Sequence, residues 1–187
     1  MRSVIQQIGP CHLAVSKPRT PFQSLVRAIA HQQLHGRAAQ TILQRFAALA
    51  KSGSFPTASE VLQLGKAPLR AVGLSQAKTL AVLDLADYVV RREIPSWQRM
   101  KNMSDEDIIA SLSRVRGIGR WTVEMVLIFQ LGRADVLALD DDGVRNGLRK
   151  ALGDEALPDK RTLAQMGEAW RPWRSIACWY LWRMSER

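Results

Sequence analysis

The sequence predicts an all-α fold, and three observations support that prediction. Apolar residues recur at helical spacing along nearly all of the 187 residues, which is the pattern of amphipathic helices. Runs of strict polar and apolar alternation, which would indicate strands, are too short and too few to build a sheet. Helix-start signals, in which a Ser or Thr precedes such a periodic run, occur repeatedly. A chain of this length suits one domain over residues 1–187, or at most two small helical lobes.

The composition indicates a soluble protein with a polyanionic partner. Lys and Arg number 27 against 17 Asp and Glu, for a net charge of +10. Such an excess favours nucleic acid through phosphate neutralisation, although charge can also serve solubility alone. Cys11 and Cys178 are the two cysteines, too few for a disulfide framework or for a cysteine-ligated zinc or iron–sulfur site. Without a signal peptide or membrane span, we expect no membrane association and a location in the bacterial cytoplasm, with the nucleoid.

Capping residues and apolar periodicity place the first two helices. Thr20 is a predicted N-cap with Pro21 at the first helical position. The apolar face of this helix comprises Phe22, Leu25, Val26 and Ile29. Residues 32–36 interrupt the pattern, and a second helix is expected from about Arg37 to Leu49, with Gly53 just beyond its end. Its predicted inward positions are Ala38, Ile42, Phe46 and Leu49.

Helix starts are predicted at three further points, each by a Ser or Thr followed by suitable residues. The starts at Thr57 and Ser104 resemble capping boxes. Ser75 opens a longer helix, which Pro95 prevents from continuing. Glu60 supports the start at Thr57, and Asp107 and Leu112 support the start at Ser104. The helix that begins at Ser75 is expected to run through Leu80, Leu83 and Val90.

The segment Val-Arg-Gly-Ile-Gly-Arg-Trp-Thr at residues 115–122 predicts a helix-hairpin-helix unit over about residues 108–131. Two glycines on either side of Ile118 allow a tight turn with positive φ, while Ile118 anchors the turn to the core. The helix that follows presents unpaired amide groups to which a DNA phosphate can bind. A Gly-x-Gly turn also simply joins helices in many proteins, and the strand and third glycine of a dinucleotide fingerprint are missing. The predicted DNA contacts are Gly117, Ile118, Gly119, Arg120 and Thr122.

Several segments resemble the helix-hairpin-helix DNA glycosylase superfamily, and within it the alkylation-repair branch typified by DNA-3-methyladenine glycosylase II. Residues 21–34 resemble the first core helix of that family with the loop after it, and residues 116–124 resemble its hairpin. Residues 131–141 resemble its catalytic loop and residues 170–182 its closing helix. The resemblance implies a two-lobed helical bundle with the active-site cleft between the lobes. The N-terminal β-rich domain of longer members has no counterpart, so the chain resembles a minimal form.

Three acids, Asp140, Asp141 and Asp142, stand where a helix is expected to begin, and by themselves they indicate N-capping. The resemblance implies that Asp141 is catalytic, because the family's catalytic aspartate is the second acid of a pair in this loop. A carboxylate beside the sugar stabilises the positive charge that develops as the base leaves, and an already cationic alkylpurine needs no second acid. Ala138 and Leu139 stand where many relatives have a proline, and the third acid leaves the register open by one residue.

Aromatic residues are the candidates for a base pocket, because electron-rich rings stack well on a cationic purine. The family places such rings at positions that correspond to Trp121 and Trp182, and Tyr180 is a third candidate. Bifunctional members carry, at the position of Trp121, a lysine that forms a Schiff base with the sugar. An indole cannot do so, and the resemblance therefore implies a monofunctional hydrolase without lyase activity. Three other tryptophans are assigned to the core: Trp170, Trp173 and Trp179.

The family fills the gap left by the flipped base with a side chain from the loop after the first core helix, and here the wedge candidates are Gln33 and Leu34. His31 and His35 have the spacing of metal ligands on a helix, but no third ligand lies nearby, so we expect no metal catalysis and no cofactor. Hairpins of relatives often bind a Na or K ion through backbone carbonyls, which here would be those of Ser113, Val115 and Ile118. The basic face is predicted to comprise Arg114, Arg116, Arg120, Arg145 and Lys150.

The resemblance implies hydrolysis of the N-glycosidic bond of alkylated purines, of the 3-methyladenine and 7-methylguanine type, after base flipping. The partner would be double-stranded DNA containing alkylated bases, and the product an abasic site; a monomer is the default expectation. Two alternatives stay open. One is a non-catalytic helix-hairpin-helix module that binds DNA without breaking a bond. The other is a glycosylase for deaminated or mismatched bases, whose neutral leaving groups need stronger acid assistance.

Overall fold

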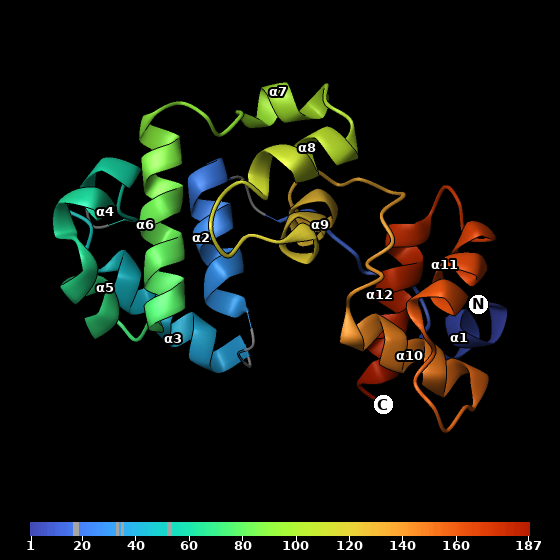
Figure 1. Cartoon of the computed structure of the whole chain (residues 1–187). Helices are drawn as coiled ribbons and strands as arrows, with labels where there is room; N and C mark the ends of the chain where they lie inside the picture. Colours follow the sequence, from blue (N-terminus) through green and yellow to red (C-terminus); the bar gives the residue numbers. More distant parts are fainter. Residues whose placement is uncertain (17–18, 33, 35, 52–53) are drawn as a thin grey trace. The chain divides into compact units, whose positions relative to one another are not determined.

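The structure, a computed structural model, describes residues 1–16, 19–32, 34, 36–51 and 54–187 (Figure 1). Within these ranges every regular element is an α-helix, which confirms the predicted all-α class. None of the helices in the described ranges has the length and apolar character that a membrane crossing requires. Prediction of an all-helical chain succeeded because helical periodicity is a strong signal when it recurs over many turns.

The chain divides into two compact units. Residues 17–126 form what we call the central unit, and residues 1–16 with 127–187 form the terminal unit. The helices of the central unit are α2 (Pro21–His31), α3 (Gly36–Ala47), α4 (Ala58–Leu64), α5 (Lys66–Ala71), α6 (Gln76–Val90), α7 (Trp97–Lys101) and α8 (Asp105–Leu112). Helix α9 (Arg120–Phe129) begins in the central unit and ends in the terminal one, which also contains α1 (Arg2–Ile8), α10 (Asp142–Leu152), α11 (Lys160–Glu168) and α12 (Arg174–Ser185).

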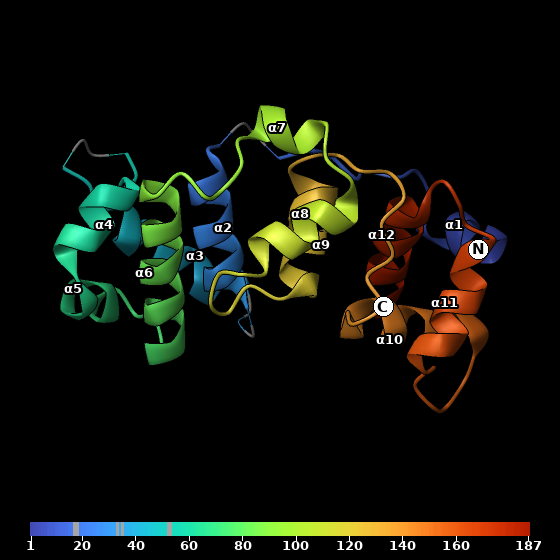
Figure 2. The ribbon, with the colours of Figure 1, turned by 45° about the horizontal axis from the view of Figure 1, so that its top comes forward.

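Within the central unit, α6 lies between α2 and α4 (Figures 1 and 2). Helix α2 begins as predicted, because the Thr20 side chain accepts a hydrogen bond from the amide of Gln23 while the Gln23 side chain accepts one from the amide of Thr20. This reciprocal capping satisfies two amides that the helix cannot pair internally. The four residues of its predicted apolar face are all buried: Phe22, Leu25, Val26 and Ile29.

The predicted inward face of α3 was wrong in part. Ala38 is exposed, and Ile42 is only half-buried, whereas Ala39, Leu43 and Phe46 form the buried stripe. Both sets of residues have helical spacing and share Phe46. Alanines lie on both faces of this helix, so periodicity alone could not show which face is buried. The helix ends at Ala47, before the expected end at Leu49, and Gly53 lies outside the described residues.

The three remaining predicted starts are confirmed. Thr57, Ser75 and Ser104 are the N-caps of α4, α6 and α8, and each side chain accepts a hydrogen bond from the amide three residues on. Helices α1, α5, α7 and α11 were not predicted from the sequence. The first three are only five to seven residues long, and so short a segment carries little periodicity of its own.

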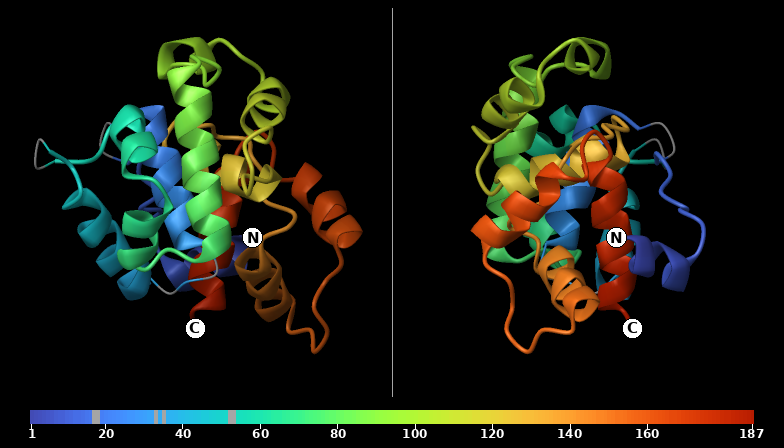
Figure 3. Two further views of the ribbon diagram at one scale, coloured as in Figure 1. Left: turned by 60° about the vertical axis from the view of Figure 1, so that its left-hand side comes forward. Right: turned by 90° about the vertical axis from the view of Figure 1, so that its right-hand side faces the viewer.

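The terminal unit is built around the contact of α10 with α12, which are adjacent in both views of Figure 3. Gly147 makes this contact possible, because a β-carbon at this position would lie 1.9 Å from the backbone oxygen of Leu181. Helix α1 also packs on α12, and the Tyr180 hydroxyl donates a hydrogen bond to the carbonyl of Gly9 (3.0 Å). The close approach of backbones therefore depends on the missing side chain of one glycine.

We expect Gly147→Ala to destabilise the terminal unit by about 3 kcal/mol or more, because the new methyl group meets the backbone of α12 and not a side chain that could rotate away. The measurement is urea unfolding followed by tryptophan fluorescence. Asn146→Ala, at the half-buried residue directly before Gly147, is the control and should change stability by no more than about 1 kcal/mol. Equal stability of the two variants would contradict this account of the helix contact.

Candidate functional site

Asp141 is the N-cap of α10, and its carboxylate side chain belongs to a buried residue. Its Oδ1 accepts a hydrogen bond from the amide of Val144 at 2.8 Å, and the residue is 8% exposed. Capping by aspartate is favourable because the carboxylate pairs an orphan amide at the positive end of the helix dipole. The N-capping predicted from the acids alone is thus confirmed, and it fixes where the carboxylate lies.

Trp182 on α12 holds the same carboxylate oxygen. Its indole Nε1 donates a hydrogen bond to Asp141 Oδ1 at 2.8 Å, and the Phe129 ring stacks on the indole with centroids 5.6 Å apart. Gly143 gives these groups room, since a β-carbon there would lie 2.9 Å from Trp182 Cδ1 and 3.0 Å from Asp141 Oδ1. Asp141 is therefore oriented by one backbone and one side-chain donor, and the indole is fixed by stacking.

The neighbouring acids have different surroundings. Asp140 forms an ion pair with Lys160. The Asp142 side chain is 85% exposed and lies 3.8 Å from Arg145 Nη1. Of the three consecutive acids, Asp141 is the buried one and the one that contacts Trp182. The geometry thus singles out Asp141, while its catalytic role stays a prediction.

An ion-pair cluster anchors the segment that leads to Asp141. Asp135 accepts hydrogen bonds from Arg174 Nε (2.6 Å) and Arg171 Nη1 (2.6 Å). The Arg174 hydrogen bond, with the charges of Arg174 and Arg171, lowers the pKa of Asp135 below its usual value. Ser175 adds a neutral link, because its Oγ donates to the carbonyl of Arg133 and accepts from the amide of Val136. The start of α12 thereby restrains residues 133–136.

The hairpin of the central unit follows the prediction with one correction. Gly117 has a φ of +74° and a β-carbon there would lie 3.2 Å from that of Ala81, so this glycine is required. Gly119 does not adopt the positive φ that was expected of both glycines, and a β-carbon there would meet nothing within 4 Å. Ile118 is buried, as predicted. The turn needs one left-handed residue, because α9 begins directly after Gly119.

The side chains predicted to contact DNA from the hairpin have intramolecular partners in this structure. Arg120 forms two hydrogen bonds with Glu106, one of them 3.0 Å between Nη1 and Oε1, and the pairing lowers the pKa of Glu106. Arg120 Nη1 also lies 3.8 Å from Glu124 Oε1. Thr122 is buried, and its hydroxyl accepts a hydrogen bond from Gln32. Contacts of this hairpin with phosphate would therefore come chiefly from its backbone amides.

The aromatic candidates occupy both units. Trp121 is half-buried in the central unit, and Trp182 is half-buried in the terminal unit. Tyr180 is buried, and its hydroxyl is bonded to Gly9, which gives it a structural contact. Assignment of these three residues to a base pocket stays a prediction. The assignment of Trp173 to the core was wrong: this residue, which stands at the N-cap position of α12, is 58% exposed.

The loop after α2 is described in part. The wedge candidate Gln33 and the residue His35 lie outside the described residues, whereas Leu34 is 38% exposed. Burial, with the charges of Arg27 and Lys78, lowers the pKa of His31. Among the described residues no group of three or more His, Cys, Asp or Glu could hold a metal ion. Of the carbonyls expected to bind a cation at the hairpin, that of Val115 accepts a hydrogen bond from the amide of Ile118 (3.1 Å). The cation itself stays a prediction.

Several residues of the predicted basic face stabilise the fold locally. Arg145 Nε donates to the carbonyl of Pro158 (3.0 Å) and Lys150 Nζ to that of Ser185 (2.8 Å). Arg114 pairs with Glu93 at 3.0 Å. Contacts of this kind cannot be predicted from a count of charges, because their acceptors are backbone carbonyls and acids remote in sequence.

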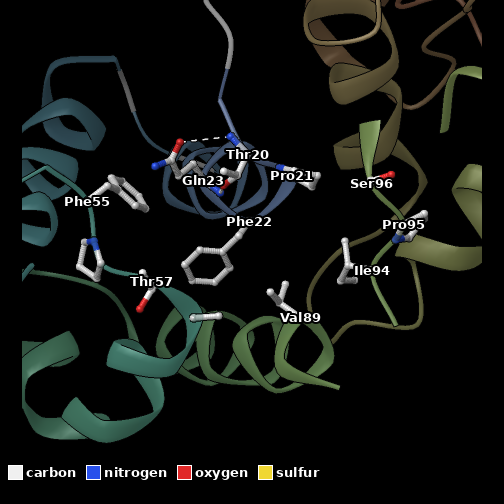
Figure 4. A pocket seen from close by; sticks show the side chains of 12 residues that line it. Thr20, Pro21, Phe22, Gln23, Phe55, Thr57, Val89, Ile94, Pro95 and Ser96 are labelled. Atoms are coloured by element: carbon white, nitrogen blue, oxygen red, sulfur yellow. Dashed lines mark hydrogen bonds between the residues drawn. The ribbon is translucent and has the colours of Figure 1, made fainter. Parts of the chain in front are cut away.

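The central unit also contains a cavity of about 350 Å³ that has no counterpart among the sequence predictions (Figure 4). Its lining includes the aromatic rings of Phe22 and Phe55 and the aliphatic side chains of Val89 and Ile94. The described residues that line it carry no carboxylate, imidazole or cationic group. It offers apolar contacts and no reacting group, so we assign it no part in the chemistry.

Comparison with known proteins finds a family model, curated relatives and solved structures to which this chain is similar. The family model described as HhH-GPD superfamily base excision DNA repair protein matches residues 26–172. DNA-3-methyladenine glycosylase 1 of Schizosaccharomyces pombe is 38% identical over 168 residues, which are 90% of this chain and 74% of that protein. The structure of the S. pombe 3-methyladenine DNA glycosylase in complex with abasic DNA matches with a TM-score of 0.91 at 35% identity, over 100% of this chain and 91% of that one. A DNA-3-methyladenine glycosidase from Bacillus halodurans matches with a TM-score of 0.84 at 32% identity, over 98% and 83% of the two chains.

The Asp135 cluster predicts a pH-dependent contribution to stability. Because the pKa of Asp135 is lower in the folded chain than its usual 3.8, the stabilisation is complete above about pH 3.8 and is lost as the pH falls through the lowered value. At pH 7, Asp135→Asn should reduce the free energy of unfolding by about 1–2 kcal/mol. Urea unfolding at a series of pH values measures the difference, with Asp154→Asn as the charge-matched control. A difference that persisted unchanged to pH 2 would rule out the ion pairs as its source.

Proposed function

The chain belongs to the HhH-GPD superfamily of base excision DNA repair proteins, and on this basis we propose that it is a DNA glycosylase that releases alkylated purines from duplex DNA. The substrates would be lesions of the 3-methyladenine and 7-methylguanine type. The observation that carries the proposal is the buried Asp141 carboxylate, oriented by Val144 and Trp182. The names of the relatives, which are DNA-3-methyladenine glycosylases, support the same substrate class.

In the proposed reaction the bond between C1′ of the deoxyribose and the purine nitrogen breaks, and its electron pair leaves with the base. Positive charge then develops on the sugar, and the Asp141 carboxylate stabilises it electrostatically. Water adds to C1′ and loses a proton, which leaves an abasic site. An N3- or N7-alkylated purine is already cationic, so the departing base needs neither a protonating acid nor a metal ion, and the scheme needs no cofactor.

The surroundings of Asp141 suit this role. The amide of Val144 and the indole of Trp182 both donate to Oδ1, and hydrogen bonds of this kind stabilise a carboxylate strongly. They also prevent the side chain from rotating, so that the charge is in place before the reaction begins. Preorganised charge accelerates a reaction more than charge that must first reorient.

The proposed enzyme is monofunctional. By its resemblance to the family, Trp121 stands where bifunctional members carry a lysine, and an indole cannot form the Schiff base that strand cleavage requires. Water is then the nucleophile, and the product is an intact strand with an abasic site. We propose that the enzyme acts as a monomer on double-stranded DNA in the cytoplasm.

Asp141→Asn should abolish most release of alkylated bases, by about a hundredfold or more, with little loss of stability. Asparagine is as good an N-cap as aspartate, and its oxygen can accept from the same two donors, so the substitution removes the charge and keeps the cap. The measurement is the quantity of free 3-methyladenine and 7-methylguanine from methylated duplex DNA. Trp182→Phe, which keeps an aromatic ring and removes the donor, should reduce release less. Undiminished release by the Asp141 variant would favour a different catalytic group, and no release by the natural chain would favour a non-catalytic DNA-binding module.

Absence of lyase activity gives a second test. Incubation of the enzyme with an end-labelled duplex that contains one alkylated purine should leave the labelled strand intact until base or heat cleaves the abasic site. Borohydride should trap no covalent complex. A nicked strand or a trapped complex would show that a lysine or the N-terminal amine acts as nucleophile, and would refute the monofunctional mechanism.

A further inference from the structure

Helix α6 of the central unit contacts both segments that are expected to meet DNA. Lys78 Nζ donates to the carbonyls of Ala30 (2.9 Å) and Gln32 (2.6 Å), at the end of α2 and the start of the loop that follows. Farther along α6, Asp84 Oδ2 accepts a hydrogen bond from the amide of Arg116 in the hairpin at 2.7 Å. A single helix thus contacts both the end of α2 and the hairpin.

A direct link joins the same two segments. The Gln32 side chain donates from Nε2 to the carbonyl of Gly117 (2.8 Å) and to the hydroxyl of Thr122 (3.1 Å). Gly117 is the left-handed residue of the turn, and Thr122 is buried in the first turn of α9. Gln32, the C-cap of α2, therefore fixes the end of this helix to both sides of the hairpin turn, across 85 and 90 residues of chain.

The placement of Lys78 requires a specific reason. Burial disfavours its charged form and lowers its pKa, so that a lysine here is costly unless its ammonium group is well paired. The two carbonyls supply that pairing at the C-terminal end of α2, where a cation also interacts favourably with the helix dipole. We call Lys78 and Gln32 the tethers, because their directional hydrogen bonds fix the end of α2 more exactly than apolar packing alone would.

We propose that Gln32 and Lys78 are positioning residues, which hold the end of α2, at Ala30 and Gln32, at a fixed distance from the hairpin, so that a side chain that follows α2 in the chain enters the base stack when the hairpin binds phosphate. The inference rests on the proposed glycosylase function. The inference adds one requirement to that function: the hairpin has to bind phosphate at a fixed distance from the side chain that enters the base stack. Neither residue would touch the reacting atoms.

The test replaces each tether by methionine, which has a similar length and no donor. Gln32→Met should slow single-turnover release of 7-methylguanine about tenfold and change the affinity for undamaged duplex less than about twofold. Lys78→Met should act in the same direction. The controls are Gln44→Met and Lys66→Met, which alter exposed residues of α3 and α5 and should leave release unchanged. Thermal unfolding establishes that the variants are folded.

A second readout does not depend on catalysis. Duplex DNA with a stable abasic analogue next to 2-aminopurine reports unstacking as a rise in fluorescence when protein binds. We expect a smaller rise with Gln32→Met than with the natural chain at equal occupancy. Equal release rates and equal fluorescence for folded tether variants and the natural chain would overturn the inference. A natural chain that unstacks the reporter but frees no base would contradict the proposed function alone.

Discussion

The terminal unit depends on how closely the backbones of α10 and α12 approach. Gly147 permits this contact, and Gly143, one turn earlier, gives space to the Trp182 indole beside Asp141. The hydrogen bond from Trp182 to Asp141 is thus a result of helix packing, since any β-carbon at these two positions would push α12 or its indole away. The packing of α10 on α12, the capping of α10 and the placement of the candidate carboxylate therefore depend on the same contacts.

The same carboxylate serves the helix and, in the proposed mechanism, the reaction. Because Asp141 caps α10, its position is determined by the start of a helix and not by the conformation of a loop. The ion pairs of Asp135 with Arg171 and Arg174 restrain the segment before it. Sites built on regular elements hold charges more accurately than sites on unrestrained loops.

Local signals predicted much of this structure, and long-range contacts account for what they missed. Thr20, Thr57, Ser75 and Ser104 all cap helices as expected, because capping depends on residues three positions apart. The buried stripe of α3 was misassigned, since the neighbours that select it are remote in sequence. The links from Gln32 and Lys78 had no sequence signal, because their acceptors are mostly backbone carbonyls. Family resemblance singled out Asp141 among three acids, and the structure adds the reason that only this one is buried against Trp182.

The pairing of Arg120 with Glu106 has a consequence for how the protein would meet a polyanion. A phosphate that reaches this guanidinium has to displace a carboxylate, so one ion pair is exchanged for another and little charge is newly neutralised. Arg114, already paired with Glu93, behaves in the same way. Fewer counterions would then be released than the 27 Lys and Arg suggest, and affinity for a polyanion would fall less steeply with added salt than a count of basic residues implies.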